Sequence, residues 1–235
     1  MEEGCYLYAF LVEESQTYGW PGGIETGRRM RKILDKGDVI LWFLFTTSII
    51  YALIEEDRIE EALEELKELF KKVKEYRQEW EKDEFEMAED LLYIASTFDE
   101  KDRLRDFVEC TALLEEKEVR NALLTGICEL ISGEERGEEA LEIAGEIEDR
   151  GWREKALYHS ALGLLKEGNL WKAVELTESF RYLNLKLEVL GEAVKAMIKK
   201  GMEEDARKIV RDVVERIKEI PQYFRENIEK SKGWR

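Results

Sequence analysis

A short unit of sequence recurs at a fixed spacing and limits the folds open to this chain. Ala140, Ala173 and Ala206 follow one another at equal intervals, and each comes a few residues after a glycine. A helix-patterned segment, such as residues 156–165 before Gly168, precedes each turn, and a second one follows it. The unit is therefore helix, turn and helix in about 33–34 residues, a period typical of stacked repeat proteins.

The residue types in this unit have physical reasons. Gly168 and Gly201 are expected to adopt the left-handed conformation that closes a helix C-terminus without steric cost. The small alanine on the second helix lets the two backbones approach closely. Other apolar residues recur at three- and four-residue steps, which gives each helix one buried stripe. One such pair cannot bury its apolar side alone, so neighbouring pairs must stack.

The pattern continues in weaker form toward the N-terminus. Residues 57–62 repeat the turn, with Asp57 in the place of glycine and Ala62 in the place of the alanine. The step from Gly133 to Gly168 is slightly longer than the step from Gly168 to Gly201, so we expect extra length in the turn between Gly133 and Gly137. The periodicity further predicts helices over residues 39–54, 57–80, 84–98 and 101–115.

The distribution of proline also indicates helices throughout. Among the 235 residues there are two prolines, Pro21 and Pro221, so a long internal stretch contains no breaker of this kind. A sandwich or barrel would need Gly- or Pro-rich turns every 8–12 residues or so, and the sequence lacks them. The predicted fold class is therefore all-α.

The repeated unit resembles that of the tetratricopeptide repeat family. Ala161, Leu164, Gly168, Leu170 and Ala173 match the small residue, the turn and the second-helix alanine of that family. The resemblance covers residues 101–220 and, more loosely, 38–100. It implies a right-handed superhelical solenoid of antiparallel helix pairs that binds proteins or peptides without catalysis. The expected organisation is an N-terminal arm or loop (1–24), the repeats (25–220) and a C-terminal capping helix or tail (221–235).

The same resemblance implies a binding groove lined by the first helix of each pair. Lysines and an arginine around an aromatic side chain would suit an acidic or carboxylate-ended segment of a protein partner. Tyr18 and Trp20 lie in a Gly- and Pro-rich loop, and they either pack onto the repeats or form a second contact. The expected groove positions are Arg120, Leu123, Lys155, Tyr158, Leu162, Lys166, Glu188, Lys195 and Lys199.

The net charge of −17 leaves two interpretations of the surface open. It makes a basic partner the natural electrostatic expectation, or else the charges are simply solvated helix faces. It also disfavours nucleic acid, because it repels a phosphate backbone on average. The alternative function is nonetheless a nucleic-acid-binding repeat protein that uses the basic residues at 28–32 and the basic C-terminal stretch.

No residue pattern indicates catalysis, a cofactor or a metal. His159 is the single histidine, which excludes HExxH and paired Glu-x-x-His motifs, and the nearest hydroxyl, Ser160, faces about 100° away on a helix. The phosphate-binding glycine motifs are missing. Cys5, Cys110 and Cys128 form no CxxC pair, and we expect Cys110 and Cys128 to be buried thiols, with a bridge as the alternative.

The uncharged segment 39–54 raises the question whether the chain crosses a membrane. It falls short of the ~20 residues that cross a bilayer, and Asp38 and Glu55 flank it, so we expect a helix buried at the centre of the fold. The acidic start lacks the basic region of a secretory signal, which favours the cytoplasm. The Glu/Lys-rich, Gln-poor composition is typical of heat-adapted proteins. Self-association as a homodimer stays open.

Overall fold

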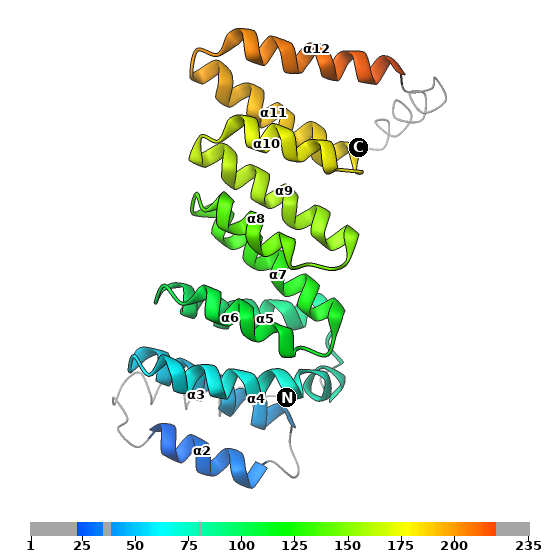
Figure 1. The fold of residues 1–235 in the computed structure, drawn as a ribbon. Coiled ribbons are helices and arrows are strands. Elements are labelled where there is room, and N and C mark those ends of the chain that lie inside the picture. Colours follow the sequence, from blue (N-terminus) through cyan, green and yellow to red (C-terminus); the bar gives the residue numbers. More distant parts are fainter. Residues whose placement is uncertain (1–22, 35–38, 80, 220–235) are drawn as a thin grey trace, which may run out of the picture. The chain divides into compact units, whose positions relative to one another are not determined.

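All regular elements in the described part of the chain are helical. The structure, a computed structural model, describes residues 23–34, 39–79 and 81–219 (Figure 1). The all-α prediction is confirmed over these ranges. Tyr18 and Trp20, nearly all of the proposed N-terminal arm, and the proposed cap at 221–235 lie outside them.

The described helices follow one another with short connections. They are α2 (Gly23–Leu34), α3 (Val39–Glu55), α4 (Ile59–Glu79), α5 (Glu84–Asp99), α6 (Leu104–Cys110), α7 (Lys117–Gly133), α8 (Gly137–Gly145), α9 (Arg150–Glu167), α10 (Leu170–Leu176), α11 (Leu183–Lys199) and α12 (Glu203–Glu219), with 3₁₀ turns η1 (Thr111–Leu113) and η2 (Thr177–Ser179) after α6 and α10. The helices predicted at 39–54, 57–80 and 84–98 are thus confirmed to within two residues at either end.

The chain divides into two compact units. The first comprises residues 1–127 and 143–153, and the second comprises residues 128–142 and 154–235. Helices α7, α8 and α9 each contribute to both.

The turns within the helix pairs share one backbone geometry. Asp102, Glu135, Gly168 and Gly201 each take a left-handed conformation, at equal intervals along the chain, and Asp57 does so further upstream. In every case the next backbone N–H donates to the carbonyl five residues earlier, as in the bond of 2.8 Å from Asn169 to Leu164. This is a Schellman closure. The left-handed conformation predicted for Gly168 and Gly201, and the turn predicted at Asp57, are confirmed.

One turn prediction was wrong. Gly133 is the last residue of α7, and Glu135 takes the left-handed conformation, with φ 63°. The step from Glu135 to Gly168 equals the step from Gly168 to Gly201, so this turn has no extra length. The prediction took Gly133 as the turn residue because glycine usually occupies a left-handed position. In this turn Glu135 occupies that position instead, at a cost of about 1 kcal/mol.

The first unit is built around α3. This helix packs against α2, α4 and α5, and its buried residues include Phe43 and Leu53. Phe43 stacks on Tyr76 of α4 with ring centroids 3.7 Å apart. The prediction of a helix buried at the centre is confirmed for this unit. Within the described residues, no helix is both long enough and apolar enough to cross a bilayer.

In the second unit the repeated small residues lie at helix contacts. Ala140, Ala173 and Ala206 are all buried, as their spacing predicted. The backbones of Gly137 at the start of α8 and Gly163 in α9 approach so closely that a Cβ built on Gly163 would lie 2.7 Å from the Cα of Gly137. Glycine is therefore required at this crossing for space, whereas at the turns it serves backbone conformation.

Candidate interaction surfaces

The groove residues expected in the first unit are not available as a surface. Leu123 is fully buried, so we correct its assignment as a partner contact, because reaching it would require opening the core. The guanidinium of Arg120 lies 3.4 Å from the Thr111 hydroxyl and 3.8 Å from the Glu146 carboxylate. Arg120 thus fastens the end of one helix pair to the start of the next.

In the second unit, most of the expected groove residues already have intramolecular contacts. Tyr158 and Leu162 pack against the core around Leu164. The Lys166 ammonium donates to the carbonyls of Ser132 and Gly133 at 3.2 and 3.3 Å, at the end of α7. Lys155, Lys195 and Lys199 are all exposed, and Lys195 pairs with Glu192 at 2.7 Å.

Two titratable residues of α9, Tyr158 and His159, lie close to carboxylates of the neighbouring helices α7 and α11. Burial, together with a hydrogen bond to Glu188, raises the pKa of Tyr158 to about 12. Burial lowers the pKa of His159, although Glu129, 3.8 Å away, opposes that shift. The hydroxyl of Ser160 donates to the Ala156 carbonyl at 2.9 Å, so it is directed along its own helix and not at the imidazole. Ser160 is therefore not placed as a nucleophile for His159.

The two described cysteines are separate buried thiols, as expected. Cys110 and Cys128 are free, and Cys128 donates to the Ala140 carbonyl at 3.3 Å. Burial raises the pKa of Cys110, which makes its thiolate scarce. Within the described ranges, no three acidic, cysteine or histidine side chains converge as metal ligands would.

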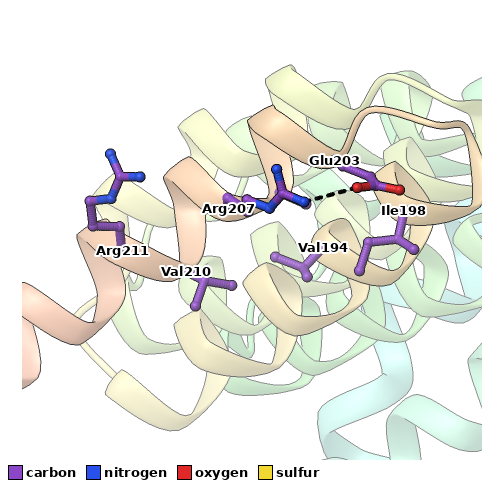
Figure 2. Close-up of a pocket in the computed structure, with 7 residues that line it drawn as sticks. Val194, Ile198, Glu203, Arg207, Val210 and Arg211 are labelled. Atoms are coloured by element: carbon purple, nitrogen blue, oxygen red, sulfur yellow. Dashed lines mark hydrogen bonds and ion pairs between the residues drawn. The ribbon is translucent and has the colours of Figure 1, made fainter.

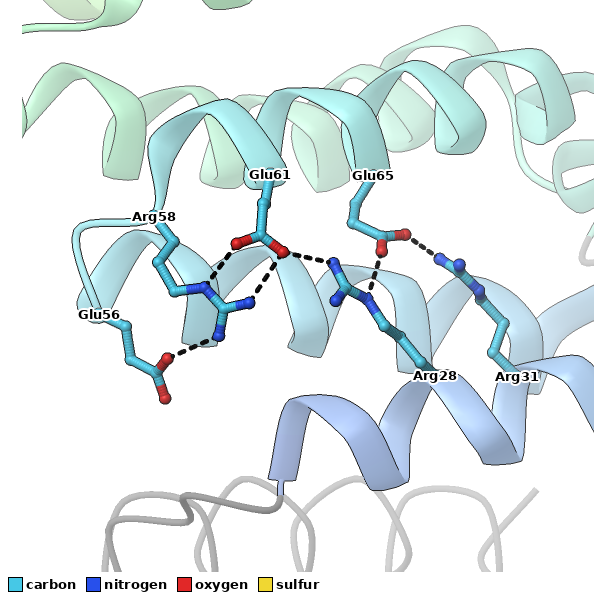
Figure 3. A network of polar contacts seen from close by, with 6 residues as sticks. All are labelled: Arg28, Arg31, Glu56, Arg58, Glu61 and Glu65. Atoms are coloured by element: carbon cyan, nitrogen blue, oxygen red, sulfur yellow. Dashed lines mark hydrogen bonds and ion pairs between the residues drawn. The ribbon is translucent and has the colours of Figure 1, made fainter.

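The basic cluster at 28–32 is largely neutralised within the protein (Figure 3). Arg28 and Arg31 both reach Glu65 of α4, whose carboxylate is buried, and Arg28 also lies 3.2 Å from Glu61. Hydrogen bonds from Arg58 and Arg28 lower the pKa of Glu61, so this carboxylate stays charged. A phosphate would therefore have to compete with carboxylates that are already in place.

Among the described residues of the first unit, the most exposed large aromatic side chains lie on α5. Tyr93 is 66% exposed and Phe85 48% exposed, although both are large rings that a core would normally bury. Phe85, Glu89 and Tyr93 are four residues apart, so they form one stripe along the helix, with the exposed Glu89 between the rings. We call these three residues the α5 stripe.

Neighbouring elements hold the rings of the stripe in place. Tyr93 meets Tyr51 of α3 edge-on, with ring centroids 5.7 Å apart. Phe85 contacts Trp152 at 5.1 Å, and the Trp152 indole N–H donates to Glu118 at 3.1 Å. Two supported aromatic rings thus flank a carboxylate on an open helix face. This combination suits a cationic side chain.

The opposite side of α5 is the core side. Met87, Leu91 and Ile94 are fully buried, and the capping box between Asp83 and Glu86 fixes the start of the helix. The α5 stripe therefore cannot rotate inward to hide its rings without exposing these aliphatic side chains. The stripe was not predicted from the sequence, because the groove positions implied by the repeat resemblance begin at Arg120.

No family model matches this chain, and no curated protein or solved structure is significantly similar to it. Its function is therefore inferred from its own geometry.

Proposed function

We propose that this chain is a non-catalytic, cytoplasmic interaction module whose α5 stripe binds an arginine- or lysine-bearing segment of a partner protein. The observation that supports this is the 66% exposure of Tyr93, one helical turn from the exposed Glu89. We further propose that the helix pairs form a right-handed superhelical solenoid similar to tetratricopeptide repeats.

The physical basis is the pairing of a carboxylate with aromatic faces. A cation placed over an aromatic ring gains about 0.5–1 kcal/mol at an exposed site and up to about 2 when desolvated. Glu89 adds a charge-assisted contact to a cation that lies against the neighbouring rings. The net charge of −17 would speed the approach of a basic segment.

This proposal reverses the partner charge that was expected from the lysines of the second unit. Lys166 donates to carbonyls at the end of α7 and Lys195 pairs with Glu192, and both contacts would compete with an acidic partner. The acidic balance of the whole chain points in the same direction as the α5 stripe. The nucleic-acid alternative loses support because Arg28 and Arg31 are paired with Glu65.

The test measures binding of a short fluorescent peptide of arginine, glycine and serine to the full chain by anisotropy. Glu89→Gln and Tyr93→Ser should each raise the Kd about tenfold, which corresponds to about 1.4 kcal/mol. Both residues are exposed, so both variants should remain folded.

Matched controls lie in the second unit. Glu175→Gln removes another exposed carboxylate, and Tyr182→Ser removes a tyrosine that is 55% exposed. Each control should change the Kd by less than about twofold, because only diffuse charge is altered. Equal effects of all four substitutions would show non-specific attraction and refute the α5 stripe as the site. Preferential binding of a labelled oligonucleotide would favour the nucleic-acid alternative instead.

A further inference from the structure

A second surface of the molecule is apolar and open. A groove of about 410 Å³ lies between α11 and α12 within the second unit (Figure 2). Ile198 and Val210, on its two sides, are 55% and 48% exposed, and Val214 continues the apolar strip along α12 at 45%. The lining residues are Val194, Ile198, Glu203, Ala206, Arg207, Val210 and Arg211.

In the preceding helix pair, α9 and α10, the face that corresponds to this groove is covered by the next part of the chain. In α9, Ala161 is fully buried in a cluster with Phe180, which directly follows η2, and with Val189 of α11 in the next pair. Glu154 is also buried, and its carboxylate accepts the backbone N–H groups of Arg181 and Tyr182 at 2.5 and 2.6 Å. This side of α9 is thus covered by α11 and by the segment that directly precedes it.

The equivalent positions of the last described pair are uncovered. Leu187 lies one repeat after the buried Glu154, yet it is 36% exposed. Val210 lies one repeat after the fully buried Thr177, yet it is 48% exposed. The face formed by α11 and α12 therefore presents apolar side chains at positions that the repeat elsewhere covers with another helix.

The sequence directly after α12 carries a matching pattern. Ile220, Tyr223, Phe224 and Ile228 recur at three- and four-residue steps, as on one face of a helix. This segment adjoins α12, so its effective concentration at the groove is far above that of a free partner.

We propose that the apolar side chains of residues 220–228 dock in the groove between α11 and α12 of the same chain. The groove is then an intramolecular docking site, and a partner helix must displace this segment to enter it. This inference is independent of the α5 stripe, which lies in the first unit.

The test is disulfide trapping in the full chain. One cysteine replaces Val210 in the groove and the other replaces Asn227, which lies between Phe224 and Ile228 on the expected face. The control pairs Asn227→Cys with Lys172→Cys, an exposed position on α10 that does not line the groove. Oxidation in dilute solution should give an intrachain bond for the groove pair at least about tenfold faster than for the control, because proximity raises effective concentration.

Each other outcome contradicts the proposal. Disulfide dimers whose yield rises with protein concentration would assign the groove to a second copy. Equal, slow oxidation of both pairs would show that the segment does not occupy it.

A double-mutant cycle gives an independent readout without cysteines. Val210→Asp and Phe224→Asp should each lower the Tm by a few degrees, and the double variant should lower it by less than their sum. Strict additivity would show that the two residues do not meet and would overturn the proposal.

Discussion

Single residues in the turns decide where each helix pair closes. The left-handed conformation occurs at glycine in two turns but at Asp57, Asp102 and Glu135 in the others. The chain therefore carries local strain at several positions where glycine would fit without cost. The constant spacing was visible in the alanines, but the identity of the left-handed residue was not, because charged residues there do not mark the turn.

Glu135→Gly should stabilise the protein by about 0.5–1 kcal/mol, because it removes a Cβ from a left-handed backbone. The converse change, Gly201→Ala, should cost about 1 kcal/mol, since a Cβ there meets no atom within 4 Å and only the backbone is strained. Urea unfolding measures both effects. Glu134→Gly, one residue earlier, is the control for lost charge, and a gain there equal to that of Glu135→Gly would refute the explanation.

His159 should make stability depend on pH. Burial lowers its pKa below the ordinary histidine value of 6.5, so as the pH falls through about 6.5 the unfolded chain takes up a proton before the folded chain does. The contribution of neutral His159 is therefore complete above that pH and is lost below it.

The check compares the wild-type chain with His159→Gln by urea unfolding at about pH 7.5 and about pH 5.5. The wild type should lose more stability on acidification than the variant. Carboxylates remote from residue 159 contribute equally to both proteins and cancel in the difference, so the remaining difference belongs to His159 together with its neighbour Glu129. Identical pH dependence of the two proteins would show that the surroundings of His159 do not disfavour its charged form.

At the scale of elements, the sequence predicted helices well where their apolar stripe was regular. The predicted helix at 101–115 is shorter in the structure: α6 ends at Cys110 and is followed by η1. The hydroxyl of Thr111 donates to the Val108 carbonyl, and Leu114 becomes extended. Such local hydrogen bonds compete with the helix and have no periodic signal.

The site was harder to predict than the helices. Leu123 was assigned to the groove by analogy, but a helix buries most of its faces when helices pack on both sides of it. Phe85, Glu89 and Tyr93 could have been found from their four-residue spacing. Recognising them as exposed, however, requires knowledge of which face of α5 meets the core.

The crossing of α8 and α9 should be intolerant of a single methyl group. Gly163→Ala would place Cβ against the Gly137 backbone, and we expect a loss of about 2–3 kcal/mol. Gly191→Ala is the matched control, since a Cβ on this exposed α11 residue meets no atom within 4 Å and should add about 0.5–1 kcal/mol of helix propensity. Chemical denaturation of both variants tests this. A neutral result at Gly163 would contradict the close approach.

At the scale of the whole molecule, charge is the property that bears most on function. The net charge of −17 coexists with many internal ion pairs, including those of Arg28 and Arg31. Several of the cations that suggested an acidic partner or a phosphate backbone, namely Arg28, Arg31, Arg120 and Lys195, lie beside carboxylates of the chain itself. The excess negative charge and the aromatic residues of α5 remain on the surface and together favour a basic partner.

The proposed binding of a basic segment at the α5 stripe can be located by photo-crosslinking. The arginine-rich peptide carries one benzophenone, and the crosslinked residues are mapped on the full chain by mass spectrometry. We expect crosslinks concentrated on α3 and α5, around Tyr51, Phe85 and Tyr93. Crosslinks spread over the acidic surface in proportion to its charge, or concentrated on residues 129–149, would contradict it.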